Sequence, residues 1–350
     1  MKIYAGIMTG GRGERFWPLS RERRPKQLLS LITGKTLLEE TVERVKPLCG
    51  DRIFFITTQV LAEKIRAMYP DLPVLVEPQG RNTAPCALYA ALWLIKRDQD
   101  ALMALLPADH YIKNGQALRE NLVFGAEFAR EGNFVTFGIR PTRPETGYGY
   151  IEAGPPLAQK EAARAFKVRK FHEKPDREVA ERYLKAGNFY WNSGMFLMRP
   201  SDLLEAMEKH APDIWRVLEK YDLLTDRGLS GFYSEVPSIS IDYAVMEKAE
   251  KMVVIEATFD WEDVGSFSAL ENLLEKDEKG NVKKGDVIYL NSSSNVFFSE
   301  KGLVAAYNVK DLIVVHTEDV TLIIPKEDAQ KVKEILREVR KIKGFEKYWK

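Results

Sequence analysis

Short apolar runs alternate with amphipathic stretches through the first 110 residues. Buried strands are predicted at residues 3–7, 52–58, 74–76 and 101–106, and helices at residues 36–45, 61–68 and 83–97. Strands that alternate with helices predict βαβ units and a mainly parallel sheet covered by helices on both faces. Ligands of such sheets bind beyond the carboxyl ends of the strands. We therefore expect the segments that follow strands 3–7, 74–76 and 101–106 to meet at one edge of the sheet.

The pattern continues less regularly and changes near residue 268. Further strands are predicted at residues 134–139, 166–175 and 252–255, and helices at residues 200–224, 243–249 and 269–274. Short apolar strands then recur every seven to nine residues without helices between them, at Val287, Val296, Leu303, Leu312 and Val320. This spacing fits the turns of a small β-helix, and an antiparallel meander is the alternative. Residues 326–343 are predicted to form a terminal amphipathic helix.

Length and composition restrict the classes of protein that fit. A chain of 350 residues, 45% of them hydrophobic, suits one large domain and a smaller one, and we place them at residues 1–267 and 268–350. A net charge of +1 predicts no general attraction to nucleic acid or to an anionic membrane. The 2 cysteines lack the spacing of a metal site and fit a reducing cytoplasm. No signal peptide or membrane-spanning run is expected.

The loop after the first strand carries the strongest chemical signal. Gly10, Gly11 and Gly13 can bring bare backbone N–H groups close to a ligand, and Arg12, Arg15 and Lys26 add positive charge. Such a loop suits phosphate. The third glycine of a dinucleotide fingerprint is missing, and so is the Gly-Lys-Ser/Thr of a Walker loop. On the glycines alone, a turn with solvated arginines is the alternative.

The complete motif is more specific than its glycines. G-G-x-G-x-R-x-x-P-L-S followed by P-K-Q resembles the signature of sugar-1-phosphate nucleotidylyltransferases, and P-x-x-R-N-T-A-P at residues 78–85 resembles a segment of the mannose-1-phosphate guanylyltransferases. The resemblance covers nearly the whole chain. It implies a mixed α/β fold, with a mainly parallel, Rossmann-like nucleotidyltransferase domain and a small C-terminal left-handed β-helix. It also implies a homodimer, because many relatives use this β-helix for dimer contacts, and the cysteine content adds the expectation of a cytoplasmic location.

The resemblance further implies the reaction and the metal. GMP is transferred from GTP to mannose 1-phosphate, and pyrophosphate is released. Asp109 and Asp260 each follow a predicted strand and could ligate Mg²⁺ together with phosphate oxygens. From the residues alone, Asp109 could equally cap a helix. In the implied mechanism these two aspartates hold Mg²⁺, and Arg15 and Lys26 neutralise the charge that develops on the phosphates.

Two further groups are assigned to the nucleotide and the sugar. Glu77, Arg81 and Asn82 are expected to bind the nucleotide with the glycine loop, although Asn82 or Thr83 could also cap the next helix. E-K-P followed by W-N-S-G-M-F resembles the family's sugar-binding pair. The residues assigned to the sugar phosphate are Gly147, Glu173, Lys174 and Asn192. For Gly147 a hairpin turn is the alternative, and for Glu173 and Lys174 a solvated ion pair.

Other residues near these motifs are given structural roles. Asp242 is expected to cap helix 243–249, and a place near the site is the alternative. The turn at residues 263–266 is expected to shape its loop. Three alternatives to the function are considered. A uridylyl- or thymidylyltransferase acting on glucose 1-phosphate would share the mechanism. A non-catalytic regulatory subunit would usually lose the loop cations or the metal carboxylates. The 4 histidines and the end of the chain at Lys350 lead us to expect no additional isomerase domain.

Overall fold

The computed structural model describes residues 2–350, which form two compact units. The first unit consists of Met1–Gly10, Val42–Pro107 and Ile112–Trp261, and the second of Gly11–Thr41, Ala108–Tyr111 and Glu262–Lys350. Each unit is described by itself. The predicted boundary at residue 267 is a single cut in the sequence, whereas each unit contains several segments. Residues 11–41, for example, pack with the C-terminal segments. The limits of the two domains stay a prediction.

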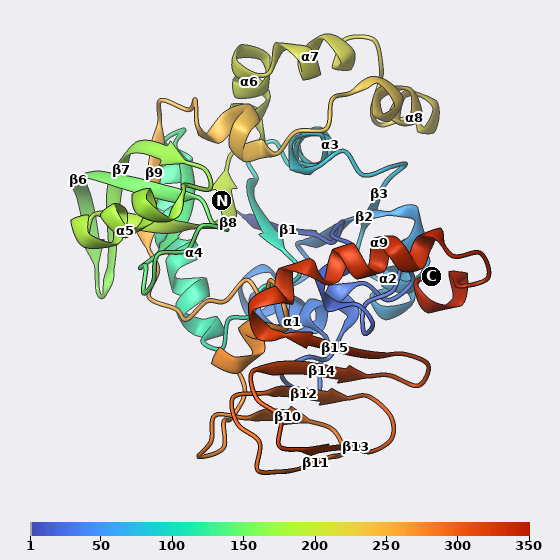
Figure 1. Cartoon of the computed structure of the whole chain (residues 1–350). Helices are drawn as coiled ribbons and strands as arrows, with labels where there is room; N and C mark the ends of the chain where they lie inside the picture. The colour runs from blue at the N-terminus through green and yellow to red at the C-terminus, as the bar shows by residue number, and fades with distance from the viewer. Residues whose placement is uncertain (1) are drawn as a thin grey trace. The chain divides into compact units, whose positions relative to one another are not determined.

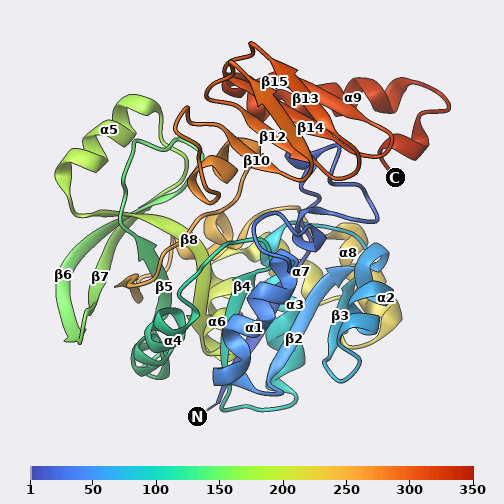
Figure 2. The same ribbon diagram turned by 90° about the horizontal axis from the view of Figure 1, so that it is seen from below.

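The first unit is built on a nine-stranded mixed sheet with the order β3-β2-β1-β4-β8-β5-β9-β7-β6 (Figures 1 and 2). Its strands are β1 (Ile3–Met8), β2 (Ile53–Thr58), β3 (Val74–Glu77), β4 (Leu102–Pro107), β5 (Phe134–Ile139), β6 (Tyr150–Lys160), β7 (Ala163–His172), β8 (Phe189–Met198) and β9 (Met252–Glu256). The first four are parallel, with Met8 opposite Ile56 and Pro107, and Thr58 opposite Glu77. The carboxyl ends of β1, β3 and β4 therefore lie at one edge of the sheet, as the strand–helix alternation predicts.

Helices cover this sheet, and their bounds follow local sequence rules. They are α1 (Leu37–Cys49), α2 (Gln59–Met68), α3 (Thr83–Ile95), α4 (Gly115–Arg130), α5 (Arg177–Ala186), α6 (Pro200–His210), α7 (Pro212–Leu218) and α8 (Asp226–Glu235). Thr36 and Glu39 form a capping box before α1, since each side chain accepts the other's backbone N–H. The single helix predicted at residues 200–224 is wrong. It breaks between α6 and α7, because Pro212 has no N–H to donate and its ring clashes with the preceding turn.

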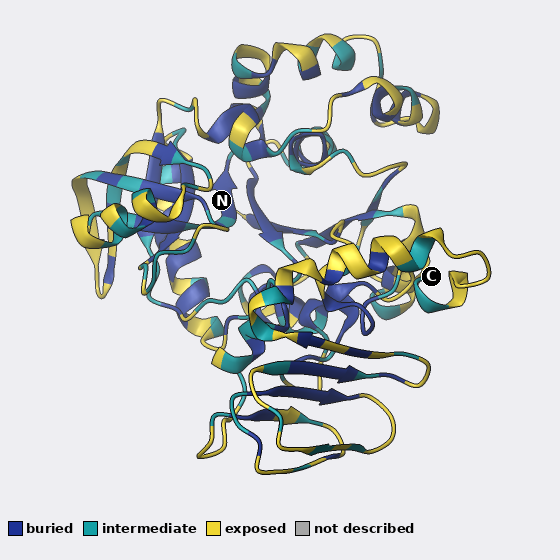
Figure 3. Cartoon of the chain, in the orientation of Figure 1, coloured by how far each residue is buried: buried dark blue, intermediate teal, exposed yellow. Residues whose placement is uncertain are grey.

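The core of the first unit lies between the sheet and its helices. Fully buried side chains from neighbouring strands, such as Phe54, Leu105 and Phe196, meet the alanine-rich face of α3. Figure 3 shows these central strands in the buried colour and the outer faces of the helices as exposed. No described helix has the length and apolar character needed to cross a bilayer.

The second unit contains stacked short strands and a terminal helix. Its strands are β10 (Val282–Lys284), β11 (Val287–Leu290), β12 (Val296–Ser299), β13 (Val304–Tyr307), β14 (Leu312–His316) and β15 (Thr321–Pro325). β10, β12 and β14 pair in parallel, as do β11 and β13, so successive turns stack (Figure 1). Buried asparagines join two turns, because Asn295 Nδ2 donates to Asn281 Oδ1 at 2.9 Å. This arrangement confirms the β-helix over the meander for these strands, while its handedness stays a prediction.

The end of the stack departs from the predicted pattern. β15 pairs antiparallel with β14. Residues 269–274, predicted as a helix, lie mostly within a 3₁₀ segment at Phe267–Asn272. The terminal helix is α9 (Val332–Lys341), preceded by a 3₁₀ segment at Lys326–Lys331. The apolar face of α9 joins a core that also includes Phe16 and Phe298, so the loop that follows Gly10 packs against the C-terminal region.

Candidate active site

The glycine loop is held in place by its contact with Lys26. Gly13 has φ 62°, and a Cβ on it would lie 2.3 Å from Lys26 Cβ and 2.9 Å from Lys26 N. Any other side chain at residue 13 would therefore collide with Lys26 and strain the backbone. The Ser20 hydroxyl donates to Gly13 O at 2.8 Å, which fastens the same turn. A short 3₁₀ turn at Glu14–Phe16 follows, and its Phe16 ring packs on Phe267 with 4.9 Å between centroids.

Lys26 and Asp109 form an ion pair within the second unit. Lys26 is 5% exposed, and its Nζ donates to Asp109 Oδ2 at 3.0 Å and to Asp263 O at 2.6 Å. Burial alone would raise the pKa of Asp109, but the charge and hydrogen bond of Lys26 outweigh it, so this pKa lies below its usual value. Asp109 is therefore an ionised carboxylate, and Oδ1 does not accept the Lys26 bond.

A cavity of about 350 Å³ opens beside this pair. It is lined by Arg12, Gly13, Glu14, Arg15, Phe16, Lys26, Asp109, Asp263, Gly265 and Lys333. Two of these charged residues are paired: Lys26 with Asp109, and Glu14 with Arg340, whose Nη1 lies 2.7 Å from Glu14 Oε1. Within residues 2–350, neither Arg12 nor Arg15 forms an ion pair. The cavity thus presents positive charge that the protein does not neutralise, and it brings together three of the predicted phosphate-side cations with Asp109.

Asp260 belongs to the first unit and lies on its surface. Its carboxylate accepts backbone N–H bonds from Lys113 at 3.1 Å and from Asn114 at 2.8 Å. The segment before α4 therefore fixes the orientation of this carboxylate. Carboxylate oxygens have more than one acceptor site each, so these bonds leave capacity for a cation.

The residues present fit Mg²⁺ but not a metal held by protein ligands alone. Among residues 2–350, no three His, Cys, Asp or Glu side chains are grouped as a metal site would require. Mg²⁺ is commonly bound by one or two carboxylates, with phosphates and water completing its shell. Asp109, ionised and on the wall of a cavity that also holds Arg12, Arg15 and Lys26, is a suitable ligand of that kind. The role of Asp260 as a second ligand stays a prediction from the sequence.

The segment assigned to the nucleotide is centred on Glu77 at the end of β3. Glu77 is 4% exposed and its Oε1 accepts the Tyr233 hydroxyl at 2.9 Å. Burial raises the pKa of Glu77 to about 7, although the bond from Tyr233 opposes the rise. A Cβ on Gly10 would lie 3.8 Å from Glu77 Oε2, so the structure places this carboxylate next to the start of the glycine loop.

Arg81 and Asn82, from the same segment, make contacts of a structural kind. Arg81 Nε donates to the carbonyl of Tyr233 at 3.0 Å, and Asn82 Oδ1 caps α3 by accepting Thr83 N at 2.8 Å. The helix cap predicted for Asn82 or Thr83 is thus confirmed at Asn82. The nucleotide contacts of both residues stay predictions.

Three of the residues assigned to the sugar lie close together in the first unit. Glu173 pairs with Lys174, and a Cβ on Gly149 would lie 2.5 Å from Glu173 Oε2 and 3.4 Å from Asn192 Cβ. Asn192 Oδ1 accepts Gly194 N at 3.0 Å, which orients the amide. Gly147 lies on an exposed turn, where its N–H donates to Glu145 at 3.0 Å.

Asp242 has a different role from the predicted helix cap. Its side chain caps no helix, and its Oδ1 instead accepts Asn192 Nδ2 at 2.8 Å. The predicted helix at residues 243–249 is a short π-helical turn at Asp242–Met246. Burial and the nearby Glu173 carboxylate raise the pKa of Asp242. The preference for capping was wrong because the sequence does not show that Asn192 is adjacent.

Two residues of the cationic cavity were not predicted from the sequence as site residues. Asp263, assigned only to loop shape, lines the cationic cavity and lies 3.8 Å from Lys26 Nζ. Lys333 reaches the same cavity from α9. Neither residue belongs to the glycine-loop motif. Both lie far from it along the chain, so no local sequence pattern connects them to the loop.

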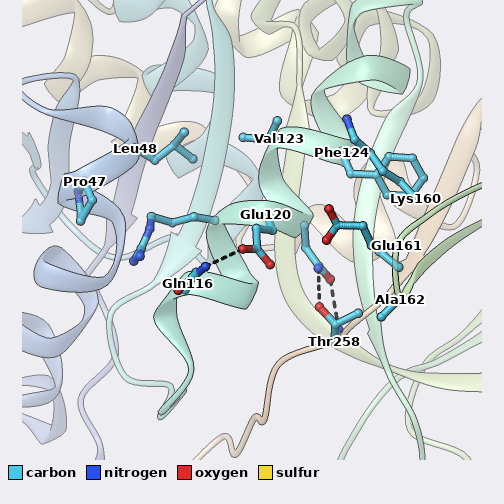
Figure 4. A pocket seen from close by; sticks show the side chains of 13 residues that line it. Pro47, Leu48, Gln116, Glu120, Val123, Phe124, Lys160, Glu161, Ala162 and Thr258 are labelled. Atoms are coloured by element: carbon cyan, nitrogen blue, oxygen red, sulfur yellow. Dashed lines mark hydrogen bonds between the residues drawn. The ribbon is translucent and has the colours of Figure 1, made fainter.

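A larger cavity in the first unit is not the phosphate site. Its volume is about 460 Å³, and its walls come from the end of α1, the start of α4 and the β6–β7 hairpin (Figure 4). Gln116 donates to Glu120 at 2.9 Å, and Asn121 donates to Thr258 at 2.7 Å. Its polar groups are therefore largely satisfied by one another, and none of the predicted site residues lines it.

Comparison with known proteins shows the family. Residues 4–280 match the family model described as nucleotidyl transferase, and residues 285–339 match the model described as MannoseP isomerase/GMP-like beta-helix domain. Mannose-1-phosphate guanylyltransferase 2 of Escherichia coli O157:H7 is 41% identical over 95% of this chain and 73% of its own length. Mannose-1-phosphate guanylyltransferase of Klebsiella pneumoniae is 42% identical over 93% of this chain and 72% of its own length.

A solved structure is similar over the same length. The crystal structure described as mannose-1-phosphate geranyltransferase from Thermus thermophilus is 39% identical, with a TM-score of 0.89. The match covers 97% of this chain and 100% of that one. Its description names a geranyl group, whereas the two curated relatives are named for a guanylyl group.

Proposed function

The chain belongs to the mannose-1-phosphate guanylyltransferases, within the nucleotidyl transferase family, and on this premise we propose that it transfers GMP from GTP to mannose 1-phosphate, releasing pyrophosphate. The observation that carries the proposal is the cavity beside the glycine loop. There Arg12 and Arg15, which form no ion pair within residues 2–350, lie with Lys26 on one wall. Asp109, which is ionised, and Asp263 lie beside Lys26 on the same wall. A triphosphate supplies the negative charge that this wall lacks.

The proposed reaction needs no nucleophile from the protein. A phosphate oxygen of mannose 1-phosphate attacks the α-phosphorus of GTP, a new oxygen–phosphorus bond forms, and the bond to the β-phosphate oxygen breaks. The electron pair of the broken bond leaves with pyrophosphate. Catalysis of such a transfer consists of positioning the substrates and stabilising charge. Arg15 and Lys26 are proposed to stabilise the charge that develops on the departing pyrophosphate.

Mg²⁺ is proposed as the cofactor, with Asp109 and Asp260 as its protein ligands. When bound, it would neutralise phosphate charge and orient the phosphate oxygens. In this proposal Lys26 keeps Asp109 ionised and directs it, since the ion pair occupies Oδ2.

The other two groups are proposed to bind the base and the sugar. Glu77, beside the glycine loop, offers a carboxylate oxygen to the N–H groups of guanine. Glu173 accepts hydroxyls of the hexose, and Asn192, oriented by Asp242 and Gly194, contributes its remaining amide hydrogen. We also propose that Lys174 pairs with the sugar phosphate, and that the enzyme acts in the cytoplasm as a homodimer.

The test measures pyrophosphate release from each of GTP, ATP, UTP and dTTP with either mannose or glucose 1-phosphate. We expect turnover with GTP and mannose 1-phosphate to exceed that of every other pair, and to be abolished by EDTA and restored by added Mg²⁺. The Asp109→Asn variant controls for contaminating activity, because it should reduce turnover by about 10²- to 10³-fold. Faster turnover of UTP or dTTP with glucose 1-phosphate would assign the chain to the alternative reaction.

A further inference from the structure

We propose that Lys333, on the terminal helix α9, binds the phosphates that leave as pyrophosphate. This inference rests on the proposed function for the identity of its ligand, and on the cavity for its geometry. Lys333 lines the cavity with Arg12, Arg15 and Lys26, although it is more than 300 residues distant along the chain. The helix at the C-terminal end of the chain thus supplies part of the phosphate-side wall.

The position of Lys333 is fixed by packing on either side of it. Its neighbour Val332 and, one turn later, Leu336 are buried in the cluster that contains Phe16. Phe16 ends the 3₁₀ turn that follows Gly13. Because one face of α9 is anchored to this turn, Lys333 is held at the cavity by the same contacts that hold the loop.

Hydrogen bonds and an ion pair extend the attachment. Arg340, about two turns beyond Lys333, pairs with Glu14 at 2.7 Å. Trp17 Nε1 donates to the carbonyl of Tyr348 at 2.8 Å, and the backbone N–H of Glu22 donates to the carbonyl of Trp349 at 3.1 Å. The loop and the end of the chain therefore form one packed assembly within the second unit.

Charge identifies the ligand as a polyanion. Lys26 is paired with Asp109 and lies 3.8 Å from Asp263 Oδ1, and Glu14 is paired with Arg340. Within residues 2–350 Lys333 forms no ion pair, and neither does Arg12 or Arg15. Other lysines of α9 or its approach do form pairs on the surface, such as Lys341 with Glu338 and Lys331 with Asp328. An ammonium on a flexible stem, with three rotatable donors, can follow a phosphate oxygen as it moves from triphosphate to pyrophosphate.

The test compares Lys333→Ala, Lys333→Arg and Lys341→Ala with the unaltered chain. Lys341→Ala is the matched control, because it removes the same charge from the same helix at a residue that does not line the cavity. The dissociation constant of pyrophosphate is measured by calorimetry with Mg²⁺ present, and KM for each substrate by pyrophosphate release. We expect Lys333→Ala to raise the pyrophosphate dissociation constant and KM for GTP roughly 3- to 10-fold, as for loss of one exposed charged contact.

Three features separate a phosphate contact from a structural effect. KM for mannose 1-phosphate should stay within about twofold, Lys333→Arg should restore pyrophosphate binding, and the loss should shrink at high salt because screening weakens exposed charges. Equal pyrophosphate affinity in Lys333→Ala and Lys341→Ala would overturn the proposal, as would a loss that arginine does not restore. Calorimetry with pyrophosphate needs no turnover, so failure of the proposed transfer reaction would be recognised separately.

Discussion

Replacing Lys26 by methionine is the most direct perturbation of the phosphate-side cavity. Methionine keeps an unbranched side chain beside Phe16 but removes the ammonium that lies 3.0 Å from Asp109. Asp109 then loses its nearest compensating charge while it stays partly buried. The substitution should therefore affect both the stability of the fold and the rate of guanylyl transfer.

The magnitude of the stability effect follows from the burial of the pair. Removing one partner of a fully buried ion pair costs about 3–5 kcal/mol. The Asp109 side chain is 31% exposed, so water compensates part of this loss. We expect the free energy of unfolding to fall by about 2 kcal/mol. For turnover, loss of one preorganised charge partner predicts a decrease of about 10²- to 10³-fold, or roughly 3–4 kcal/mol.

The pH dependence of stability gives a second measure of the same pair. Because the pKa of Asp109 is lowered in the folded state, its ionisation contributes stability above the unfolded pKa, and this contribution is lost as the pH falls through the folded pKa. Without Lys26, burial is the dominant influence and raises that pKa. The difference in unfolding free energy between Lys26→Met and the unaltered chain should therefore narrow as the pH falls from the raised pKa of Asp109 in the variant to its lowered pKa in the unaltered chain.

Denaturant unfolding at several pH values and pyrophosphate release with GTP and mannose 1-phosphate measure the two effects. Asp109→Asn and the double variant complete a cycle, and the double variant should be little worse than the poorer single variant because the two side chains act as a pair. A correctly folded Lys26→Met enzyme with turnover within threefold of the unaltered chain would refute the reasoning.

Three further predictions test other parts of the molecule. The pKa of Glu77 rises from 4.5 to about 7 on folding, so unfolding free energy should fall by about 3 kcal/mol as the pH rises through this interval, and Glu77→Gln should remove this dependence in denaturant titrations. Asp242→Ala should raise KM for mannose 1-phosphate about 10-fold while leaving KM for GTP unchanged, because Asn192 loses its orienting acceptor; an equal rise in both constants would argue against this. Gly285→Ala places a Cβ 1.9 Å from the carbonyl oxygen of Ser299 at φ 87°, so thermal unfolding should show a loss of at least about 2 kcal/mol, and an unchanged melting temperature would contradict it.

Local sequence rules determined the secondary structure of this protein and the residue types of its motifs. The capping box of Thr36 and Glu39 is local, because both partners lie within one turn. The period of the apolar residues likewise predicted β1–β4 and the change to stacked strands. The split at Pro212 was also readable from local chemistry, although the prediction of a single helix overlooked it.

Only the tertiary structure decided which side chains meet. Lys26 and Asp109 are separated by 83 residues, and Glu14 and Arg340 by 326, so no local period relates them. The same holds for Asp242, in a π-helical turn, whose partner Asn192 lies on β8, and for Lys333, which reaches the phosphate-side cavity from the terminal helix. The physical reason is that propensity and periodicity act within a few turns of the chain, whereas charge compensation and shared burial act across space between segments that the sequence leaves far apart.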